Sequence, residues 1–245
     1  MGKTIAVVSG KGGTGKTSFT ANTGMALAAM GQRVLCLDCD IVLRNLDLAL
    51  GLSEESVMDF GDILAGRCTL EEAVVTHSSY PSLQLLAAPA NYNSSQIPYD
   101  QFAKLIREIK AKYDYCLIDS PAGLGLGFQL ATAFADSAIV ITTTDTSALR
   151  DAQRTVMELD RFPNGHLHLV VCRVARKMLK SLHSTIDDAM DIAGLPLLGV
   201  IPEDADVPYT LNRGLPLRER NYYAARAYEN IAKRLTGAKV PLMKI

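Results

Sequence analysis

The chain has 245 residues, of which 48% are hydrophobic and 21% charged, with a net charge of −1. This composition is typical of a globular protein with one large core, so residues 1–245 are expected to form a single domain. The balanced charge gives no reason to expect a polyanionic partner, and DNA binding is not expected. No run of eighteen apolar residues occurs, which excludes a membrane-spanning helix. Five cysteines at irregular spacings are typical of reduced thiols in a cytoplasmic protein.

Short apolar runs rich in strand-forming residues alternate along the chain with segments of helical periodicity. The runs predict strands at Thr4–Ser9, Arg33–Asp38, Leu83–Ala87, Tyr115–Asp119, Ser137–Thr142, Leu167–Cys172 and Leu197–Ile201. The segments between them predict helices at Lys16–Met30, Tyr99–Lys112, Ala148–Asp160, Ser181–Ala193 and Tyr222–Leu235. This alternation predicts an α/β fold, a mostly parallel twisted sheet of seven or eight strands flanked by helices. Ligands then bind at the carboxyl ends of the strands.

A glycine-rich loop lies between the first predicted strand and the first long helix. It satisfies the pattern G-x-x-x-x-G-K-[ST] in the strand–loop–helix context that this pattern requires, which predicts the P-loop NTPase fold. Glycines let the loop curl around a phosphate, and the amino end of the helix adds unpaired N–H groups. Lys16 is expected to reach the β- and γ-phosphates, and the Thr17 hydroxyl to ligate Mg²⁺. The nucleotide-binding loop is predicted to comprise Gly10, Lys11, Gly12, Gly13, Thr14, Gly15, Lys16, Thr17 and Ser18.

Lys11 is a second lysine inside this loop. Taken alone, the loop leaves two interpretations open: a solvated lysine, or a charge supplied to a phosphate across a subunit interface, as an arginine finger supplies it. The run Lys11–Thr17 resembles the deviant Walker A motif of the MinD/ParA ATPases, in which this lysine reaches the partner's nucleotide. Further stretches that resemble this family are Leu37–Asp47, Asp114–Gly123 and Gly199–Pro216. The resemblance implies a homodimer in the ATP-bound state.

Three aspartates lie at the ends of predicted strands. Asp38 and Asp119 each end a strand, and Asp40 follows two residues after Asp38. In a parallel sheet these ends converge on the phosphate site, where a divalent cation and an attacking water need acidic groups. We expect Asp119 to hold Mg²⁺ through water, as the Walker B residue of the family does, and Asp38 to support its water shell. By resemblance, Asp40 orients the attacking water; the alternative for each aspartate is that it only begins a turn.

The base-binding region departs from the family pattern. The sixth strand of the family usually ends in Asn-Arg, and its asparagine reads adenine, whereas Cys172-Arg173 stands here. A thiol lacks the paired donor and acceptor of an amide. The remaining candidates for contact with the base region are Arg173, Pro202, Glu203 and Asp204. ATP is predicted because the loop resembles that of ATP-using relatives and no guanine-specific Asn-Lys-x-Asp motif occurs.

Other patterns carry weaker functional interpretations. Cys36 and Cys39 are spaced C-x-x-C, but on a strand they point to opposite faces and are expected to be buried thiols. The basic run Arg173, Arg176, Lys177 and Lys180 is interpreted as a solvated face rather than a DNA surface. Residues 237–245 are expected to form a flexible tail. MinD proteins typically end in a basic amphipathic helix that binds anionic membranes, but Pro241 interrupts such a helix here, so a frayed end is the alternative.

These patterns together predict an Mg²⁺-dependent ATP hydrolase that works as an ATP-driven dimerisation switch in MinD-like division-site placement. Its predicted catalytic residues are Lys11, Lys16 and Asp40. The resemblance implies a MinC-like or MinE-like partner and a cytoplasmic protein that can lie on the inner face of the cell membrane. The alternatives are a flagellar-number regulator, a ParA-type partitioning ATPase, a biosynthetic synthetase, and a metal-centre maturation or electron-transfer ATPase resembling the nitrogenase iron protein.

Overall fold

The computed structural model describes residues 1–53, 55, 57–90, 97–175, 182–217 and 222–243. The strands are β1 (Lys3–Val8), β2 (Val34–Asp38), β3 (Val75–Thr76), β4 (Leu83–Leu86), β5 (Tyr115–Asp119), β6 (Ser137–Thr142), β7 (Leu167–Val174) and β8 (Leu197–Pro202). The helices are α1 (Lys16–Ala29), α2 (Leu46–Leu50), α3 (Phe60–Leu64), α4 (Leu70–Ala73), α5 (Tyr99–Lys112), α6 (Leu126–Ala133), α7 (Thr146–Met157), α9 (Leu182–Ala193), α10 (Asp206–Leu211) and α11 (Tyr222–Leu235).

The strands form one sheet in the order β3-β4-β2-β5-β1-β6-β7-β8. The two-residue strand β3 runs antiparallel to β4, and the other pairs are parallel. β1 lies in the interior of the sheet between β5 and β6, with Ile5 level with Leu117 on one side and Ser137 on the other. The loop that follows β1 therefore leaves the sheet at the middle of its carboxyl edge, where ligands of parallel α/β sheets bind.

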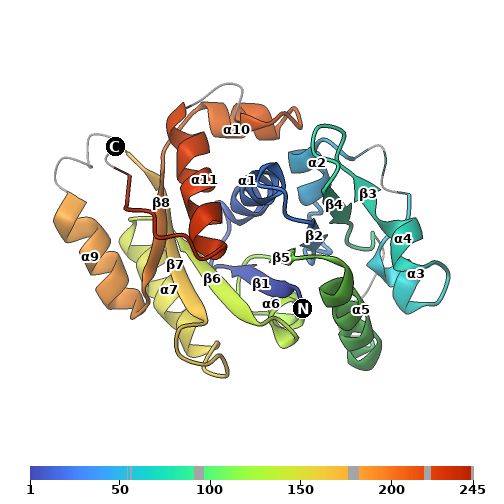
Figure 1. The fold of residues 1–245 in the computed structure, drawn as a ribbon. Helices are drawn as coiled ribbons and strands as arrows, with labels where there is room; N and C mark the ends of the chain where they lie inside the picture. Colours follow the sequence, from blue (N-terminus) through green and yellow to red (C-terminus); the bar gives the residue numbers. More distant parts are fainter. Residues whose placement is uncertain (54, 56, 91–96, 176–181, 218–221, 244–245) are drawn as a thin grey trace.

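Helices cover both faces of the sheet (Figure 1). α1 and α11 pack on one face, against side chains such as Val34 and Cys36 of β2. α3, α4, α5 and α6 pack on the opposite face, where the alternate residues Leu35 and Leu37 of the same strand lie. α7 and α9 continue that second layer over β6 and β7. Each central strand is buried on both sides, which explains why its sequence is apolar throughout.

The structure confirms the predicted fold class and the order of the predicted strands and helices, with differences of a few residues at their ends. Ser181, the predicted start of the fourth helix, lies outside the described residues. The sequence prediction missed β3 and the helices α2, α3, α4, α6 and α10, which have two to eight residues each. Segments this short complete at most about two helical turns, so their periodicity does not stand out in the sequence.

The tail after α11 has no regular secondary structure between Ala238 and Met243. The guanidinium group of Arg234 donates hydrogen bonds to the carbonyl oxygens of Val240 (3.0 Å) and Pro241 (2.8 Å). These contacts tie the tail to the last helix. The flexibility of residues 237–245 stays a prediction, and Lys244 and Ile245 lie outside the described residues.

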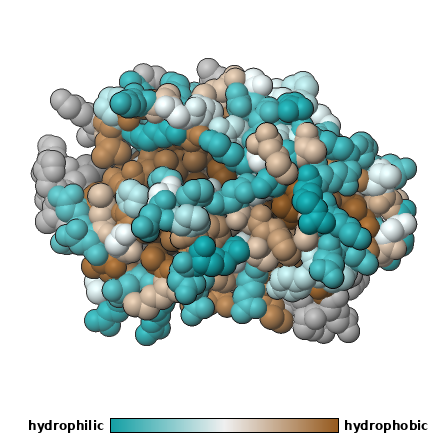
Figure 2. Space-filling model, turned by 60° about the horizontal axis from the view of Figure 1, so that its bottom comes forward, coloured by the Kyte–Doolittle hydropathy of each residue, from teal (hydrophilic) through white to brown (hydrophobic). Residues whose placement is uncertain are grey.

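Among the helices that the structure describes, none is both long and apolar enough to cross a membrane. Figure 2 turns the bottom of Figure 1 toward the viewer. On this face hydrophilic residues form most of the protruding surface, and hydrophobic residues show mainly in the recesses between them.

Candidate functional site: a phosphate loop and a nucleotide cleft

The loop between β1 and α1 has a shape that depends on its glycines. Gly13 and Gly15 have positive φ values of 75° and 105°. Residues with a side chain adopt this backbone conformation only with strain, whereas glycine adopts it readily. Gly10 lies so close to α7 that an added Cβ would be 2.6 Å from the carbonyl oxygen of Asp151. The glycines that define the motif are therefore required by the geometry of the loop itself.

Lys16 begins α1 and is almost completely buried, with an exposed fraction of 8%. Its ammonium group donates a hydrogen bond to the Ser9 hydroxyl (2.8 Å), which in turn donates to the carbonyl oxygen of Lys11 (2.7 Å). Burial lowers the pKa of Lys16, and the carboxylates of Asp119 and Asp40 oppose that shift. The ammonium group is thus held at a fixed point beside the loop, where a phosphate would neutralise it.

A hydroxyl and a carboxylate meet at the start of α1. The Thr17 hydroxyl donates to one carboxylate oxygen of Asp119 (2.7 Å), and the Thr20 hydroxyl donates to the other (3.2 Å). Burial raises the pKa of Asp119 to about 6, against the hydrogen bond from Thr17 and the charge of Lys16. Oxygen ligands of this kind are those that Mg²⁺ prefers. Thr17 and Asp119 therefore fit the predicted magnesium site.

Asp38 lies beside Asp119 on the neighbouring strand, and the two residues are in register. Its oxygens accept hydrogen bonds from the backbone N–H groups of Asp40 (2.8 Å) and Leu46 (3.4 Å). Burial and the charge of Asp119 raise the pKa of Asp38 well above its usual range. In this structure Asp38 fixes the loop after β2, and its contact with the water shell of Mg²⁺ stays a prediction.

Asp40 lies at the cleft beside the phosphate loop. One oxygen of its carboxylate accepts hydrogen bonds from the backbone N–H groups of Val42 (3.2 Å) and Leu43 (3.1 Å). These bonds give Asp40 the turn-forming role that was its alternative interpretation. Its second carboxylate oxygen accepts no hydrogen bond from the described residues. Both roles are therefore compatible with its position.

The cleft at the carboxyl edge of the sheet has a volume of about 760 Å³, within the usual range for ligand sites. Predicted residues lining it are Gly12, Gly13, Gly15, Lys16, Thr17, Ser18, Asp40, Arg173, Pro202, Glu203 and Asp204. Asp38 and Asp119 are buried beside it, and so is Thr14, whose hydroxyl has no partner among the described residues. An orphaned hydroxyl and a buried ammonium group beside this cleft fit a polyphosphate ligand.

Lys11 does not line the cleft. Its ammonium group is exposed and donates a hydrogen bond to the Ser147 hydroxyl at the start of α7 (3.1 Å). The side chain therefore lies on the outer surface beside the phosphate loop, and the structure of one chain leaves its phosphate contact untested.

The far end of the cleft contains the candidates for base binding. Arg173 adopts a left-handed conformation (φ 57°) and donates to the carbonyl oxygen of Gly13 (3.3 Å). It also forms a long ion pair with Glu203 (3.8 Å) in which both side chains are more than half exposed. Asp204 accepts a hydrogen bond from the backbone N–H of Asp206 and so begins α10. Cys172 is buried beside Gly15, where the family has its asparagine.

The cysteine pattern adds no metal site among the described residues. Cys36 and Cys39 are buried in core clusters on opposite faces of the sheet, as predicted. The described residues contain no group of three or more His, Cys, Asp or Glu side chains that could hold a metal ion. Arg176, Lys177 and Lys180 lie outside the described residues, so the interpretation of the basic run stays a prediction.

Known proteins are similar to this chain in sequence and in fold. The family model described as an AAA domain matches residues 2–167. The septum site-determining protein MinD of Synechocystis is 40% identical over 99% of this chain and 92% of its own length. The structure of the MinC:MinD cell division protein complex of Aquifex aeolicus is 38% identical, with a TM-score of 0.89 over 98% of both chains. MinD of Pyrococcus horikoshii, solved with Mg-ADP, is 30% identical, with a TM-score of 0.82 over 98% of this chain and all of that one.

The parallel sheet, the phosphate loop and the Thr17–Asp119 pair define a P-loop ATP hydrolase. Within that class the chain belongs to the MinD/ParA family, and its similarity extends over the whole MinD domain. It is therefore an ATPase of the MinD type, which acts in placement of the division site.

Several residues of the site were not among the predicted ones, including the polar residues Asn45, Ser120 and Asn212 that line the cleft. Ser9 precedes the motif by one position, and only its contact with Lys16 reveals its role. Tyr228 lines the cleft from α11, far from the phosphate loop in the sequence. No local pattern in the sequence could have identified Tyr228, because the packing of α11 against α1 brings it to the site.

Proposed function

We propose that ATP binding closes this protein into a homodimer, that hydrolysis opens the dimer, and that the dimer positions a MinC-like or MinE-like partner. The observation that carries the proposal is the place of Lys11. It belongs to the phosphate loop, yet its ammonium group is exposed and lies outside the cleft of its own chain. A second copy facing this surface would receive the Lys11 ammonium group at its own nucleotide.

Exposed apolar side chains on the loops around the site support an interface there. Val42 and Leu43, in the loop that contains Asp40, are 86% and 64% exposed, and Leu126 at the start of α6 is 45% exposed. Both loops begin at strand ends beside the phosphate loop. Burial of these three side chains between two copies would remove apolar surface from water only in the closed state.

The residues of the cleft have distinct roles in the proposed hydrolysis. Lys16 binds the β- and γ-phosphates from within the chain, and Lys11 of the second copy adds charge from outside. Thr17 and Asp119 would hold Mg²⁺, with Asp38 on the neighbouring strand supporting its water shell. Bound there, the cation would supply positive charge to the phosphates. Asp40 orients the attacking water through the carboxylate oxygen that the turn does not use.

The relatives support the remaining parts of the proposal. The Aquifex aeolicus protein was solved in complex with MinC, which is the model for a partner of this chain. The Pyrococcus horikoshii protein was solved with Mg-ADP, which supports ATP and Mg²⁺ as ligands here. We also propose that residues 1–245 act as one domain, since one continuous sheet runs through the chain.

We extend the proposal to location: a cytoplasmic protein that gathers on the inner face of the cell membrane through its tail. Leu242 in the tail is 54% exposed, and Lys239 lies three residues before it. Co-sedimentation with anionic vesicles under a non-hydrolysable ATP analogue tests this part. Equal sedimentation of the whole chain and of a chain ending before Ala238 would contradict it.

The dimer proposal is tested with two lysine variants. Lys16→Ala should lose Mg·ATP binding in isothermal titration, because the phosphates lose their cationic contact within the chain. Lys11→Ala should bind the nucleotide but stay monomeric by light scattering in a non-hydrolysable analogue. Lys104→Ala on α5, which removes an exposed lysine distant in sequence from the loop, is the matched control and should dimerise. A Lys11→Ala protein that dimerises as the wild type does would contradict the proposal.

A further inference from the structure

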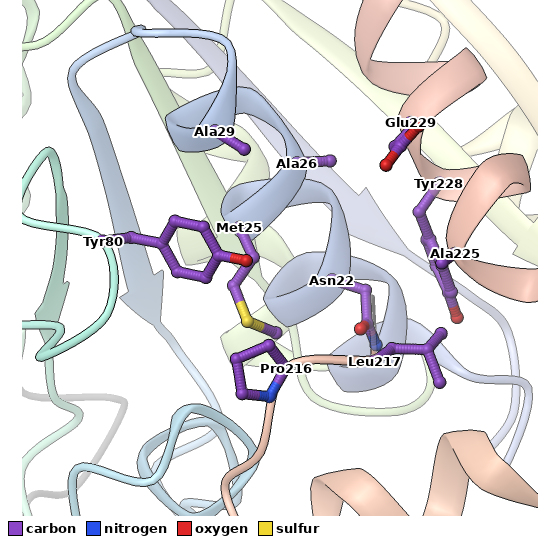
Figure 3. Close-up of a pocket in the computed structure, with 10 residues that line it drawn as sticks. All are labelled: Asn22, Met25, Ala26, Ala29, Tyr80, Pro216, Leu217, Ala225, Tyr228 and Glu229. Atoms are coloured by element: carbon purple, nitrogen blue, oxygen red, sulfur yellow. The ribbon is translucent and has the colours of Figure 1, made fainter. Parts of the chain in front are cut away.

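Tyr228 forms a wall shared by two hollows. On one side its ring lines the nucleotide cleft, and on the other it lines a small cavity of about 30 Å³ with Asn22, Met25 and Leu217. Figure 3 shows Tyr228 on α11, with its hydroxyl oxygen pointing away from Glu229 and toward the segment that contains Leu217. The ring packs between α11 and Phe19 of α1. Cys172 and Asp204, whose charges act on the Tyr228 hydroxyl group, both line the cleft, which places this group near the cleft.

The Tyr228 side chain is only 3% exposed, and its hydroxyl group makes no hydrogen bond with the described residues. The hydroxyl oxygen is not among the fully enclosed unpaired atoms, so it retains some contact with an open hollow. The ring packs against Phe19 of α1, with 6.4 Å between the ring centroids. Burial, with the nearby Cys172 and Asp204, raises the pKa of Tyr228 well above its usual range, so the group stays a phenol and can donate a proton. A buried donor of this kind is stabilised when a ligand supplies an acceptor.

The other polar side chains at this end of the cleft either form a hydrogen bond within the chain or are exposed to solvent. Asp204 accepts the hydrogen bond that begins α10, and Arg173 and Glu203 form their exposed ion pair. Cys172 offers a thiol, which is a weak donor. The amide side chain of Asn212 also lines this end and is exposed. The remaining wall is largely apolar, formed by Ile201, Pro202, Val207, Pro208 and Leu211. A flat heteroaromatic ring fits such a wall, and Tyr228 offers it a buried donor.

We propose that the Tyr228 hydroxyl donates a hydrogen bond to the purine base of the bound nucleoside triphosphate and so fixes the base in the cleft. Adenine has unprotonated ring nitrogens that accept such a bond. The inference rests on the proposed function, because the phosphate loop must hold the triphosphate at the other end of the cleft. It assigns a contact with the base to Tyr228, which is not among the residues predicted from the sequence.

The test compares two ligands, Mg·ATP and Mg·tripolyphosphate, which shares the phosphate chain but has no base. Tyr228→Phe keeps the ring and removes only the hydroxyl, so its affinity for ATP should fall about three- to tenfold while its affinity for tripolyphosphate stays unchanged. Tyr115→Phe is the matched control: it removes a buried hydroxyl that bonds the carbonyl oxygen of Leu235 at the end of the same helix, away from the cleft. It should change neither affinity. Affinities are measured by titration calorimetry, with displacement for weak ligands.

The ratio of the two affinities separates the outcomes. Equal losses of affinity for both ligands, or no loss for ATP, would overturn the role of Tyr228. A variant that is merely less stable would lose affinity for both ligands equally, so only a loss specific to ATP supports the proposed contact with the base. Failure of the wild type to bind either ligand would instead overturn the proposed function. Lys16→Ala serves as the reference for that case, since it should weaken both ligands together.

Discussion

Replacing Asp119 by Asn is expected to stabilise the nucleotide-free protein and to weaken its response to Mg·ATP strongly. Asp119 is buried, and its pKa is raised from 3.8 to about 6. A carboxyl group whose pKa is raised by folding disfavours the folded state when it is ionised. This cost is fully present above the folded pKa of about 6 and is relieved as the pH falls toward the unfolded value.

The magnitude follows from the size of the shift. Each unit of pKa corresponds to about 1.4 kcal/mol, so the ionised carboxylate costs about 3 kcal/mol near pH 7.5 and about 1–2 kcal/mol near pH 5. An asparagine has nearly the same shape and can keep hydrogen bonds with Thr17 and Thr20, but it carries no charge. Asp119→Asn should therefore raise the free energy of unfolding by about 2–3 kcal/mol near pH 7.5, and by less near pH 5.

Urea unfolding at the two pH values, each with and without Mg·ATP, measures this effect. The wild type should gain stability from Mg·ATP and the variant should gain much less, because the cation loses its carboxylate. Thr20→Val, which removes only one of the two hydroxyls, is the control and should keep most of the response to Mg²⁺. A variant that is less stable than the wild type near pH 7.5 would refute the reasoning.

Three further predictions concern the loop, the catalytic turn and the backbone. Ser9→Ala should weaken Mg·ATP binding about five- to thirtyfold in calorimetry, because the Lys16 ammonium group loses its anchor; unchanged affinity would show that the anchor is dispensable. Asp40→Ala should keep nucleotide binding but lower phosphate release about 10²–10⁴-fold, and near-normal turnover would rule out its role. Gly51→Ala should lower the urea midpoint more than Gly66→Ala, since both have positive φ but only Gly51 would bring a Cβ within 2.7 Å of another backbone; equal losses would contradict this.

Most of the fold and the phosphate-binding half of the site could be predicted from the sequence. Buried parallel strands are apolar on both faces, so β2 and β5 were recognisable without their neighbours. The phosphate loop is a continuous stretch of nine residues, so its sequence pattern can be recognised directly. Its backbone conformation requires glycine at positions such as Gly13 and Gly15, and it places Lys16 and Thr17 at the start of α1. Asp119 was predictable because it ends a fully buried strand.

The base half of the site could not be predicted in the same way. Tyr228 reaches the cleft only because α11 packs across α1, and nothing in its neighbours marks it as different from a core tyrosine. The turn formed by Asp40 depends on the N–H groups of Val42 and Leu43, which a sequence pattern does not orient. Likewise, the direction of Lys11 follows from its contact with Ser147 on α7.

The nucleotide state is expected to set the number of chains in the particle. Light scattering coupled to gel filtration, with Mg²⁺ and either ADP or a non-hydrolysable ATP analogue, measures this number directly. We predict a monomer of 26.5 kDa in ADP and a particle of twice that mass in the analogue. The same mass in both nucleotides, whether of one chain or of two, would contradict the account.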